Sequence, residues 1–302
     1  MWPNAIDTMF KRIMIALALL GTMALPGNAQ LLWRIDGNDL PGPSYVFGTY
    51  HYETVSFCDS IPGFNDAFHA VQQVFFETVL SDVALQGVGL KLKMMPDGRT
   101  LNSLYTTEEM EDILEMVKRY TGVRYEKVTF TPGSLTTFLR SLLYEKAHPE
   151  SQNPEWEPME ITLQKRASTN GQLVSGLETL EFQMDLLHQK NTSLYKQATA
   201  LLAMARNPES DPERLISHLH HLRAAYRNQD LEMLGEFFSS LPDDSGMETI
   251  LDDRNERWIP IITEAVQSAP SMIIVGAGHL VGENGILSLL KKEGYLLSPI
   301  QE

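Results

Sequence analysis

Two histidines of this chain occur in the same local pattern, and that pattern can present a side chain for chemistry. Each stands three residues after a glycine that ends an apolar, β-prone run: His51 follows Gly48, and His279 follows Gly276. Glycine lets the backbone turn sharply at the end of a buried strand and lets another group approach closely. Open α/β sheets bind their ligands at the carboxyl ends of their strands. If the two strands are neighbours, the pattern predicts two imidazoles on one rim of a sheet.

Glu77 is the third residue of this kind, because it ends the apolar run Val74-Phe75-Phe76. A carboxylate at the tip of a buried strand needs a cation, a metal ion or several hydrogen-bond donors. Two imidazoles and one carboxylate are a common ligand set for a divalent catalytic metal with an open water position. The residues alone leave two alternatives open. Glu77 forms a salt bridge with an arginine such as Arg254, or each histidine only hydrogen-bonds within its own turn.

The remaining histidines are weaker candidates. His218, His220 and His221 resemble a metal cluster, but at about 100° per residue on one helix His220 points away from His218. We therefore interpret this cluster as solvent-exposed helix surface. Three further histidines have no partner at a useful spacing: His69, His148 and His188. The sequence also lacks the G-x-S-x-G, H-E-x-x-H and Walker motifs.

The elements that must position these residues are strands at both ends of the chain and helices between them. Residues 30–80 read as strands separated by turn residues, and residues 271–297 contain two more strands around a short helix. Between about residues 100 and 268 the chain is predominantly helical. We therefore expect an α/β fold, on the border of α+β, with a central mixed sheet built from the N- and C-terminal segments. The large helical middle region should pack around that sheet in a single domain, residues 30–302.

Local signals mark individual helices. Thr106 and Glu109 have the spacing of a capping box, and Asp211 before Pro212 is a good N-cap followed by proline in the first turn. The three prolines of residues 145–158 indicate a loop. Four apolar residues recur at the spacing of one helix face: Leu177, Leu180, Met184 and Leu187.

Composition and charge exclude several classes of protein. The chain has 302 residues, of which 43% are hydrophobic, and this is ordinary for a globular protein. It carries 39 acidic and 24 basic residues, which gives a formal charge of −15. Because polyanion binding needs a basic surface, we expect no nucleic-acid partner.

Residues 1–29 have the pattern of a secretory signal peptide. Lys11 and Arg12 precede an apolar run that is shorter than the about 20 residues needed to span a bilayer, and small residues precede position 30. We expect an exported protein, periplasmic or secreted, that meets a membrane only through this segment if it is not cleaved. The one cysteine, Cys58, cannot form an internal disulfide, and we interpret it as a buried, inert thiol.

Several short blocks together resemble the TraB/GumN family, which includes the TIKI metalloproteases and the pheromone-shutdown proteins. The strand that leads to His51 is similar to the first G-x-x-H of the family, and Glu77 is similar to its strand-end glutamate. His279 lies in a block similar to the second G-x-x-H with its G-E-x-G tail. The G-L-E-T block at residues 176–179 and the D-R-N block at residues 253–255 match family blocks in the expected order.

The resemblance implies an exported hydrolase of the peptidase type that depends on a divalent metal ion of the manganese, cobalt or zinc class. Its substrate would be a peptide or another small amide or ester. The family's catalytic and metal-binding roles fall on His51, Glu77 and His279. Arg254 and Asn255 would bind the substrate or support the ligands.

We place Gly48 and Gly276 in the same supporting group. The chain departs from the family at Thr78, where a second acidic residue is common, and Asp82 is a weak substitute. Two mechanisms stay open. A metal ion lowers the pKa of a bound water, or a histidine acts as general base and Glu77 orients it without any metal.

Two functions of other classes compete with the hydrolase. A non-catalytic protein would sequester an extracellular peptide in the same cleft, and a purely structural exported domain would use its histidines only in turns. The hydrolase hypothesis predicts that His51, Glu77 and His279 cluster in one concave pocket with Arg254 lining it. Histidines on opposite edges of the sheet would end the hypothesis of a shared site.

Overall fold

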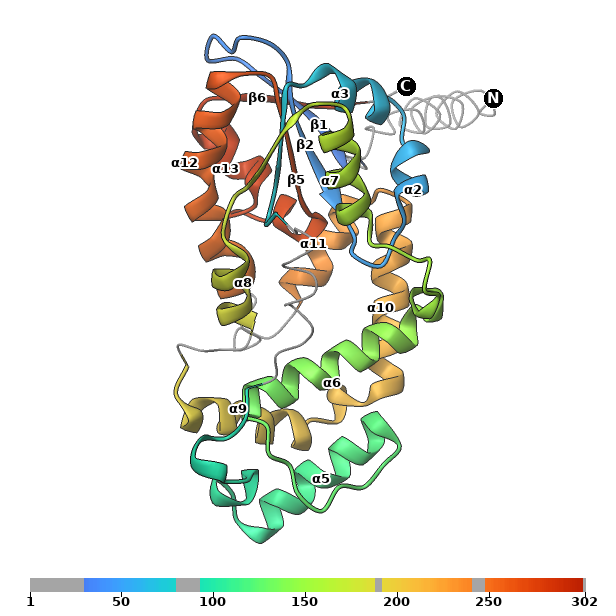
Figure 1. Cartoon of the computed structure of the whole chain (residues 1–302), viewed down its shortest axis with the longest axis vertical. Helices are drawn as coiled ribbons and strands as arrows, with labels where there is room; N and C mark the ends of the chain where they lie inside the picture. The colour runs from blue at the N-terminus through green and yellow to red at the C-terminus, as the bar shows by residue number, and fades with distance from the viewer. Residues whose placement is uncertain (1–29, 80–92, 188–191, 241–247, 301–302) are drawn as a thin grey trace, which may run out of the picture.

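A sheet of strands and a group of helices form the two halves of the molecule in a computed structural model (Figure 1). The structure describes residues 30–79, 93–187, 192–240 and 248–300. The predicted signal peptide, Asp82 and His188 lie outside these ranges. Within them, the sheet has six strands in the order β4-β3-β5-β2-β1-β6. Their bounds are β1 Leu32–Asp36, β2 Ser44–Thr49, β3 Gln73–Phe76, β4 Leu173–Gly176, β5 Ser271–Gly276 and β6 Leu296–Pro299.

Four neighbouring strands of the sheet run parallel: β4, β3, β5 and β2. The strand β1 is antiparallel to β2 on one side and to β6 on the other. The predicted α/β fold with a mixed sheet built from both ends of the chain is therefore confirmed. Parallel neighbours bring their carboxyl ends to one edge of a sheet, and this edge faces the helical half of the molecule (Figure 1).

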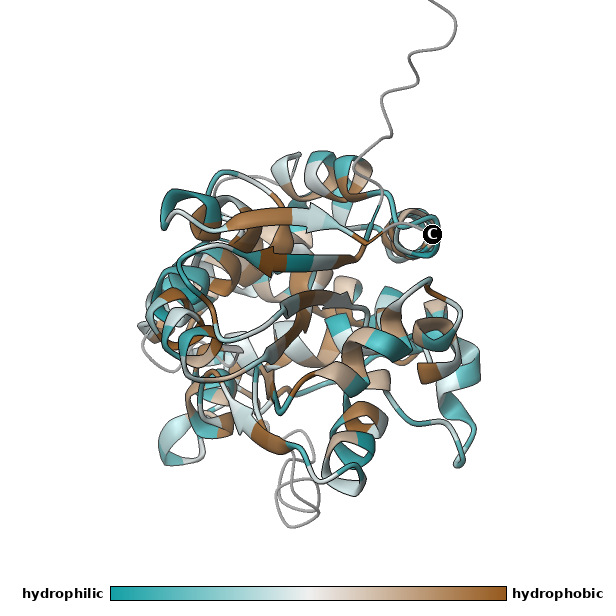
Figure 2. Cartoon of the chain, turned by 90° about the horizontal axis from the view of Figure 1, so that it is seen from above, coloured by the Kyte–Doolittle hydropathy of each residue, from teal (hydrophilic) through white to brown (hydrophobic). Residues whose placement is uncertain are grey.

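Helices cover both faces of the sheet. On one side lie α2 (Val55–Asp59), α3 (Phe64–Ala70) and α7 (Met159–Thr169), and on the other lie α12 (Asp253–Ser268) and α13 (Ile286–Lys292) (Figure 1). The central strand β2 is buried along its whole length, as expected for a continuous apolar run between two helix layers. Seen from above, apolar strands lie inside and hydrophilic residues lie largely outside (Figure 2).

The helical half has a hydrophobic core of its own. It is built by α5 (Thr107–Thr121), α6 (Pro132–Ala147), α9 (Leu194–Arg206) and α10 (Pro212–Arg227). The last of these helices also takes part in the sheet core. Leu219 of α10 belongs to the helical core, whereas Leu222 and Tyr226, one and two turns later, belong to the core around the sheet.

The remaining described elements are α8 (Leu180–Leu187), α11 (Leu231–Ser239) and several short turns of helix. These turns are Pro96–Gly98, Leu101–Ser103, Pro149–Gln152, Pro208–Ser210, Glu248–Asp252 and Ala277–Leu280. A membrane-crossing helix, long and apolar enough for a bilayer, is not found among the described residues.

The predicted helix starts are confirmed. At the start of α5 the Thr106 side chain accepts a hydrogen bond from the Glu109 N–H, and the Glu109 carboxylate accepts one from the Thr106 N–H. At the start of α10 the Asp211 carboxylate accepts bonds from the backbone N–H groups of the first turn. Each cap satisfies donors that the helix itself leaves unpaired.

Two local predictions were wrong, and one strand was not predicted. The strand β4 lies inside the region expected to be helical, because it is a short edge strand held by backbone bonds to β3 rather than by an apolar pattern. The helices α2 and α3 lie inside the region expected to hold strands, although Phe64, Ala67 and Phe68 are buried at helical spacing. The predicted helix face began at Leu177, but α8 begins at Leu180 and Leu177 is buried in the core before it.

Cys58 has the environment expected of an inert thiol. It is fully buried, its Sγ lies 3.8 Å from the Met159 Sδ, and burial raises the pKa of its thiol well above the ordinary value. A thiol with so high a pKa does not supply the thiolate that a nucleophile requires.

Candidate functional site

The ends of the four parallel strands bring the candidate residues to one edge of the sheet. His51 follows β2, and His279 lies in the turn after β5, the parallel neighbour of β2. Glu77 follows β3, which is the next strand along. Glu178 comes two residues after β4, where the bonds from the Leu177 N–H to the Phe76 carbonyl and from the Glu178 N–H to the Glu77 carbonyl continue the pairing. The two histidine turns therefore share an edge, as the hypothesis of a common site requires.

Glu77 accepts hydrogen bonds on both oxygens of its carboxylate. The Gly276 N–H donates to Oε1 at 2.8 Å, and the Arg254 Nη2 donates to Oε2 at 2.6 Å. The amide nitrogen of Gln183, in α8, donates to Oε2 at 3.0 Å. The salt bridge to Arg254 is one of the alternatives that the sequence left open for this buried carboxylate.

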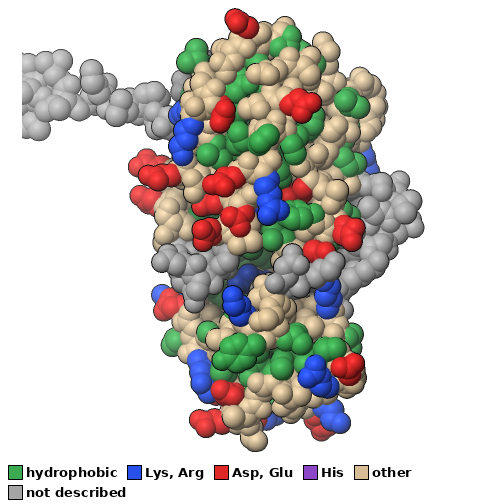
Figure 3. Space-filling model, turned by 90° about the vertical axis from the view of Figure 1, so that its left-hand side faces the viewer, with side chains coloured by type: hydrophobic (Ala, Val, Ile, Leu, Met, Phe, Trp, Pro, Cys, Tyr) green, Lys and Arg blue, Asp and Glu red, His purple; other side chains and the backbone are tan. Residues whose placement is uncertain are grey.

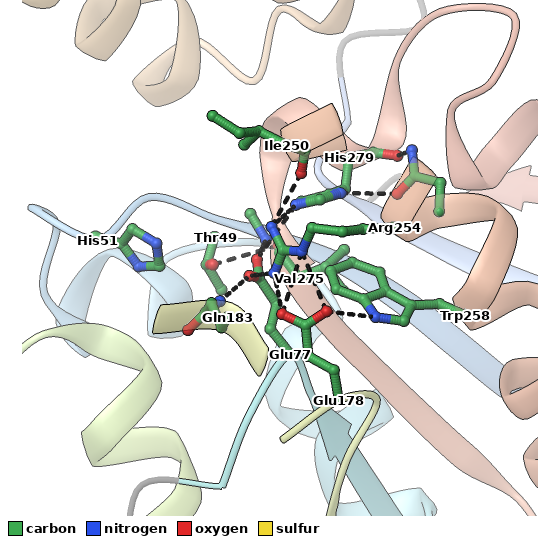
Figure 4. A network of polar contacts seen from close by, with 12 residues as sticks. Thr49, His51, Glu77, Glu178, Gln183, Ile250, Arg254, Trp258, Val275 and His279 are labelled. Carbon is green, nitrogen blue, oxygen red and sulfur yellow. Dashed lines mark hydrogen bonds and ion pairs between the residues drawn. The ribbon is translucent and has the colours of Figure 1, made fainter. Parts of the chain in front are cut away.

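Arg254 lies at the start of α12 and is the centre of the polar network (Figure 4). Its Nη2 also donates to Glu178 Oε1 at 2.8 Å, and its Nη1 contacts the His279 Nε2 at 3.1 Å. The guanidinium carbon lies 4.4 Å from the ring centroid of Trp258. The indole N–H of Trp258 donates in turn to Glu178 Oε2. The side chain of Arg254 is only 5% exposed, so this network holds a buried positive charge.

His279 is a buried histidine whose tautomer is set by its neighbours. The amide nitrogen of Asn255 donates to the backbone carbonyls of His279 and Asn284, which fixes the orientation of that amide. Its oxygen therefore faces the His279 Nδ1 at 2.7 Å, so Nδ1 carries the proton and donates it. The lone pair then lies on Nε2, where it accepts from Arg254. Asn255 therefore fixes the orientation of the His279 ring, and its predicted role in binding or catalysis stays a prediction.

His51 lies at the same edge but makes a different set of contacts. Its Nδ1 is 2.8 Å from Oε1 of Glu160, in the first turn of α7, while its side chain is 66% exposed. Two residues further on, the buried Glu53 pairs with Arg223 of α10. That ion pair ties the turn to the helical half. In Figure 4 the His51 ring lies beside the hydrogen-bonded network rather than within it.

The two imidazoles have opposite electrostatic environments. The Glu160 carboxylate raises the pKa of His51 to about 9, and the charge of Glu77 adds to that effect. Burial lowers the pKa of His279 to about 4, and Arg254 adds to that effect while Glu77 opposes it. Burial alone would raise the pKa of Glu77, but His279 and Arg254 outweigh it and hold that pKa at about 2. At neutral pH the buried imidazole is therefore neutral and the buried carboxylate is ionised.

The two predicted glycines have separate structural roles. A Cβ at Gly48 would lie 2.8 Å from the Leu280 Cδ1 and 3.1 Å from the Ala277 Cα, so this glycine lets the two histidine turns pack together. A Cβ at Gly276 would lie 3.3 Å from the Glu77 Oε1, the oxygen to which its own N–H donates. The N–H of Gly276 thus binds the Glu77 carboxylate. The absence of a side chain at Gly48 makes room for the turn that carries His279.

Sequence reasoning missed three members of the site. Glu178 lies in the G-L-E-T block noted in the sequence, but no role was assigned to it because β4, which it follows as Glu77 follows β3, was not predicted. Glu160 carries no local signal, since it reaches His51 from α7, a helix more than a hundred positions further along the chain. Gln183 was placed on a helix, but its contact with Glu77 needs the tertiary structure.

The surface of the molecule is hollowed at the waist between its two halves (Figure 3). Lys and Arg side chains lie around this hollow, and Asp and Glu side chains gather on the sheet half above it (Figure 3). Two shallow surface cavities formed by described residues lie elsewhere. One is lined by residues of the β1–β2 turn and the other by residues of the α2–α3 turn.

The three histidines of α10 lie on its exposed surface, as predicted. His218, His220 and His221 are all exposed, and the His220 Nε2 lies 3.1 Å from the backbone oxygen of Ala147. His148 is buried, with its Nδ1 near the Tyr144 carbonyl and its Nε2 near the Tyr50 hydroxyl. The contacts of His220 and His148 give these two side chains structural surroundings.

The arrangement of the described residues does not fit a divalent ion. They contain no group of three or more His, Cys, Asp or Glu side chains placed to hold one. The donor set itself gives the reason, because the Glu77 Oε2 and the His279 Nε2 both face the guanidinium of Arg254. A metal ion needs those same lone pairs, and a second positive charge beside a buried guanidinium is strongly unfavourable.

Comparisons with known proteins cover nearly all of the described residues. A family model described as the TraB/PrgY/gumN family matches residues 31–299. The chain is similar to Metalloprotease TIKI2 of Danio rerio, with 24% identity over 88% of this chain and 60% of that protein. It is similar to Metalloprotease TIKI1 of Xenopus tropicalis, with 24% identity over the same shares. The Metalloprotease TIKI homolog of Nematostella vectensis is 22% identical over 84% of this chain and 64% of that protein.

The chain thus spans about three-fifths of the length of these curated relatives. No solved structure matches it.

Proposed function

The chain belongs to the TraB/PrgY/gumN family, and from that membership and the geometry of the sheet edge we propose that it is an exported hydrolase of an amide or ester bond in a peptide. The relatives carry the name metalloprotease, and their low identity makes this name a guide to reaction class rather than to substrate. Residues 30–302 would form the exported domain after removal of the signal peptide, and this domain would reside in the periplasm or be secreted.

The observation that carries the proposal is the pair formed by His51 and Glu160. The His51 side chain is 66% exposed and its Nδ1 lies 2.8 Å from the largely buried Glu160 carboxylate, so the carboxylate engages Nδ1 and not Nε2. This is the arrangement in which a carboxylate orients a histidine base and stabilises the imidazolium that forms when the base takes a proton. The pair lies at the carboxyl edge of a parallel sheet, where open α/β sheets bind their ligands.

In the proposed reaction, the neutral form of His51 removes a proton from water through Nε2. The water oxygen bonds to the substrate carbonyl carbon while the carbonyl π electrons move to its oxygen. The oxygen's electron pair then re-forms the carbonyl as the carbon–nitrogen or carbon–oxygen bond breaks, and the leaving group takes the electrons of that bond and the proton that His51 returns. Glu160 keeps the imidazole oriented throughout and balances its charge. No step passes through a metal ion, because Arg254 already binds the Oε2 of Glu77 and the Nε2 of His279.

The buried network would form the wall beside this base. Arg254 of α12 binds Glu77 after β3, Glu178 after β4 and His279 after β5, so the network holds the edge in one shape. A rigid wall supports catalysis because it positions the reacting groups before the substrate arrives. Substitution of a wall residue should therefore affect stability as well as rate.

The test is a cleavage assay of the purified protein on a mixed peptide library, with products identified by mass spectrometry. The assay is run both with EDTA and with added MnCl2, so that its outcome does not depend on metal. We expect cleavage by the parent, and a loss of about 10³-fold in kcat/KM for His51→Asn, the magnitude typical of removing a general base. The melting temperature of His51→Asn should stay within about 2 °C of the parent because the side chain is exposed.

His69→Asn is the matched control, since His69 is an exposed histidine of α3 in the same half of the molecule. Its activity should equal that of the parent. If the parent cleaves nothing, or if His51→Asn cleaves as fast as the parent, the proposal is wrong. Tight stoichiometric binding of a peptide without any product would favour the sequestering protein instead.

Export is tested separately. Expression of the full chain in a bacterium, followed by fractionation and N-terminal sequencing, should give an exported protein that begins near Gln30. A full-length protein retained in the cytoplasm would contradict this part of the proposal.

A further inference from the structure

Arg254 is a buried cation whose hydrogen-bonding capacity is fully used by the described protein. A guanidinium has five N–H groups. The Nε–H is directed at the Glu178 carboxylate at 3.2 Å, and the two Nη2 hydrogens serve Glu77 at 2.6 Å and Glu178 at 2.8 Å. The two Nη1 hydrogens serve the Ile250 carbonyl and the His279 Nε2, each at 3.1 Å. None of the five is left for a substrate.

The groups that surround Arg254 are those that would otherwise bind a metal ion. Two carboxylates and the lone pair of one imidazole converge on its guanidinium, and each of the three comes from the end of a different parallel strand. Carboxylate oxygen and imidazole nitrogen are common ligands of divalent catalytic metals. The ring of Trp258 lies over the guanidinium, and such a planar stack suits arginine.

The two carboxylates carry one more negative charge than Arg254 neutralises, and neutral hydrogen-bond donors stabilise it. Glu77 and Glu178 carry two negative charges against one positive charge. Three neutral donors share the remainder: the Gly276 N–H and the Gln183 amide on Glu77, and the Trp258 indole on Glu178. Hydrogen bonds to a carboxylate stabilise its charged form, so the network is complete as it stands.

We infer that the Arg254 guanidinium is the resident cation of this site and takes the position that a divalent ion would require between Glu77, Glu178 and His279. The buried network therefore holds no metal. Arg254 is a positioning residue, because it acts on Glu77 and His279 and does not touch the substrate. This inference deepens the proposed function, on which its bearing on catalysis rests, but its test uses metal binding and thermal stability and needs no substrate.

The decisive measurement is a titration of the untagged parent protein, first treated with EDTA and desalted, with MnCl2, CoCl2 and ZnCl2 in a calorimeter. We expect no ion bound at this network, which means that Glu77→Gln leaves any weak uptake unchanged. The melting temperature of the parent should shift by less than about 1 °C when EDTA or excess metal is added, because only a ligand bound to the folded state stabilises it.

A substitution of the arginine should convert the network into a metal site. Arg254→Met leaves two carboxylates and an imidazole facing one another without a cation, so its melting temperature without metal should fall by about 10 °C. Excess MnCl2 or ZnCl2 should then restore several degrees and bind with near-unit stoichiometry. The matched control is Arg257→Met, because Arg257 lies one turn further along α12, is exposed and stacks on Phe182. The control should show neither the loss nor the rescue.

One equivalent of metal bound by the parent and lost in Glu77→Gln would overturn the inference, as would a fall of several degrees in the parent melting temperature on adding EDTA. A folded Arg254→Met that gains no metal would also overturn it. If Arg254→Met does not fold, the parent titration and its Glu77→Gln counterpart still decide the question. A parent that cleaves no peptide but binds no metal would end the proposed function and leave this inference standing.

Discussion

The two histidine turns have the same spacing, follow neighbouring parallel strands and reach the same edge, yet they place their imidazoles in opposite surroundings. The ring of His51 is two-thirds exposed and paired with Glu160, whereas the ring of His279 is 4% exposed and held by Asn255 and Arg254. The spacing sets where each histidine lies along the edge. The elements that pack against each turn, α7 for one and α12 for the other, set what each histidine can do.

This difference divides the tasks between the turns. An exposed imidazole with a bound carboxylate can exchange protons with solvent and with a ligand. A buried imidazole with both nitrogens engaged mainly fixes its neighbours in place. A pattern that occurs twice therefore does not show that its two copies share one role.

The largest expected effect concerns the exposed turn. Glu160→Gln keeps the shape of the side chain but removes the charge that raises the pKa of His51 to about 9. Because only the neutral imidazole acts as base, kcat/KM of the parent should rise with pH and level off above pH 9. In Glu160→Gln the rise should move to lower pH, and the plateau should fall about 100-fold. Glu157→Gln, on the same side of the molecule but paired with Lys165, should keep the parent profile.

An unchanged profile in Glu160→Gln would show that the carboxylate does not control His51, and the contrast between the turns would lose its cause.

A smaller effect is expected from the buried turn, and it should be one of stability. The pKa of His279 is lowered to about 4 in the folded protein, while an unfolded chain has a histidine pKa of about 6.5. Between these two values the unfolded state binds a proton that the folded state does not. The melting temperature should therefore fall as the pH drops from about 6.5 to 4.

His279→Asn removes this titrating group while its amide can still donate to Asn255. Its melting temperature at pH 8 should be about 5 °C lower, since Arg254 loses an acceptor, but its decline between pH 6.5 and 4 should be shallower than that of the parent. Calorimetry at several pH values checks this. An equal decline in both proteins would mean that other groups carry the acid sensitivity.

The smallest effect tests the contact between the turns. Gly48→Ala would place a Cβ against Leu280 and the backbone of Ala277, so its melting temperature should fall by about 3 °C through overpacking. Gly235→Ala is the control, because that Cβ would lie 3.6 Å from the Val281 Cβ, which is an ordinary contact, and a helix favours alanine over glycine. A stable Gly48→Ala would show that the turns are not packed as one unit.

Much of this architecture was readable from local sequence because short-range physics determines it. The apolar runs before Gly48, Glu77 and Gly276 predict buried strands, and the parallel neighbourhood of the two histidine strands follows the expected arrangement. The caps at Thr106 and Asp211 depend only on residues within one turn, so the sequence marks them directly.

The partners of the site were not readable because tertiary packing determines them. Glu160 and Glu178 come from α7 and from the turn after an edge strand whose exposed Leu173 gives little apolar signal. The sequence left salt bridge and metal ligand open for Glu77 because both satisfy a buried carboxylate equally well in principle. Only the position of Arg254 in space distinguishes the two.

The helix α10 is shared by both hydrophobic cores, with Leu219 in one and Leu222 and Tyr226 in the other. If either core unfolds, α10 loses one of its packed faces, and the other core loses part of the support that this helix gives it. The two halves of the molecule are thereby coupled in their unfolding. Arg223 of the same helix pairs with Glu53 beside the His51 turn. Partial unfolding of the helical half would therefore also free the turn that carries the proposed base, and activity would be lost in the same transition.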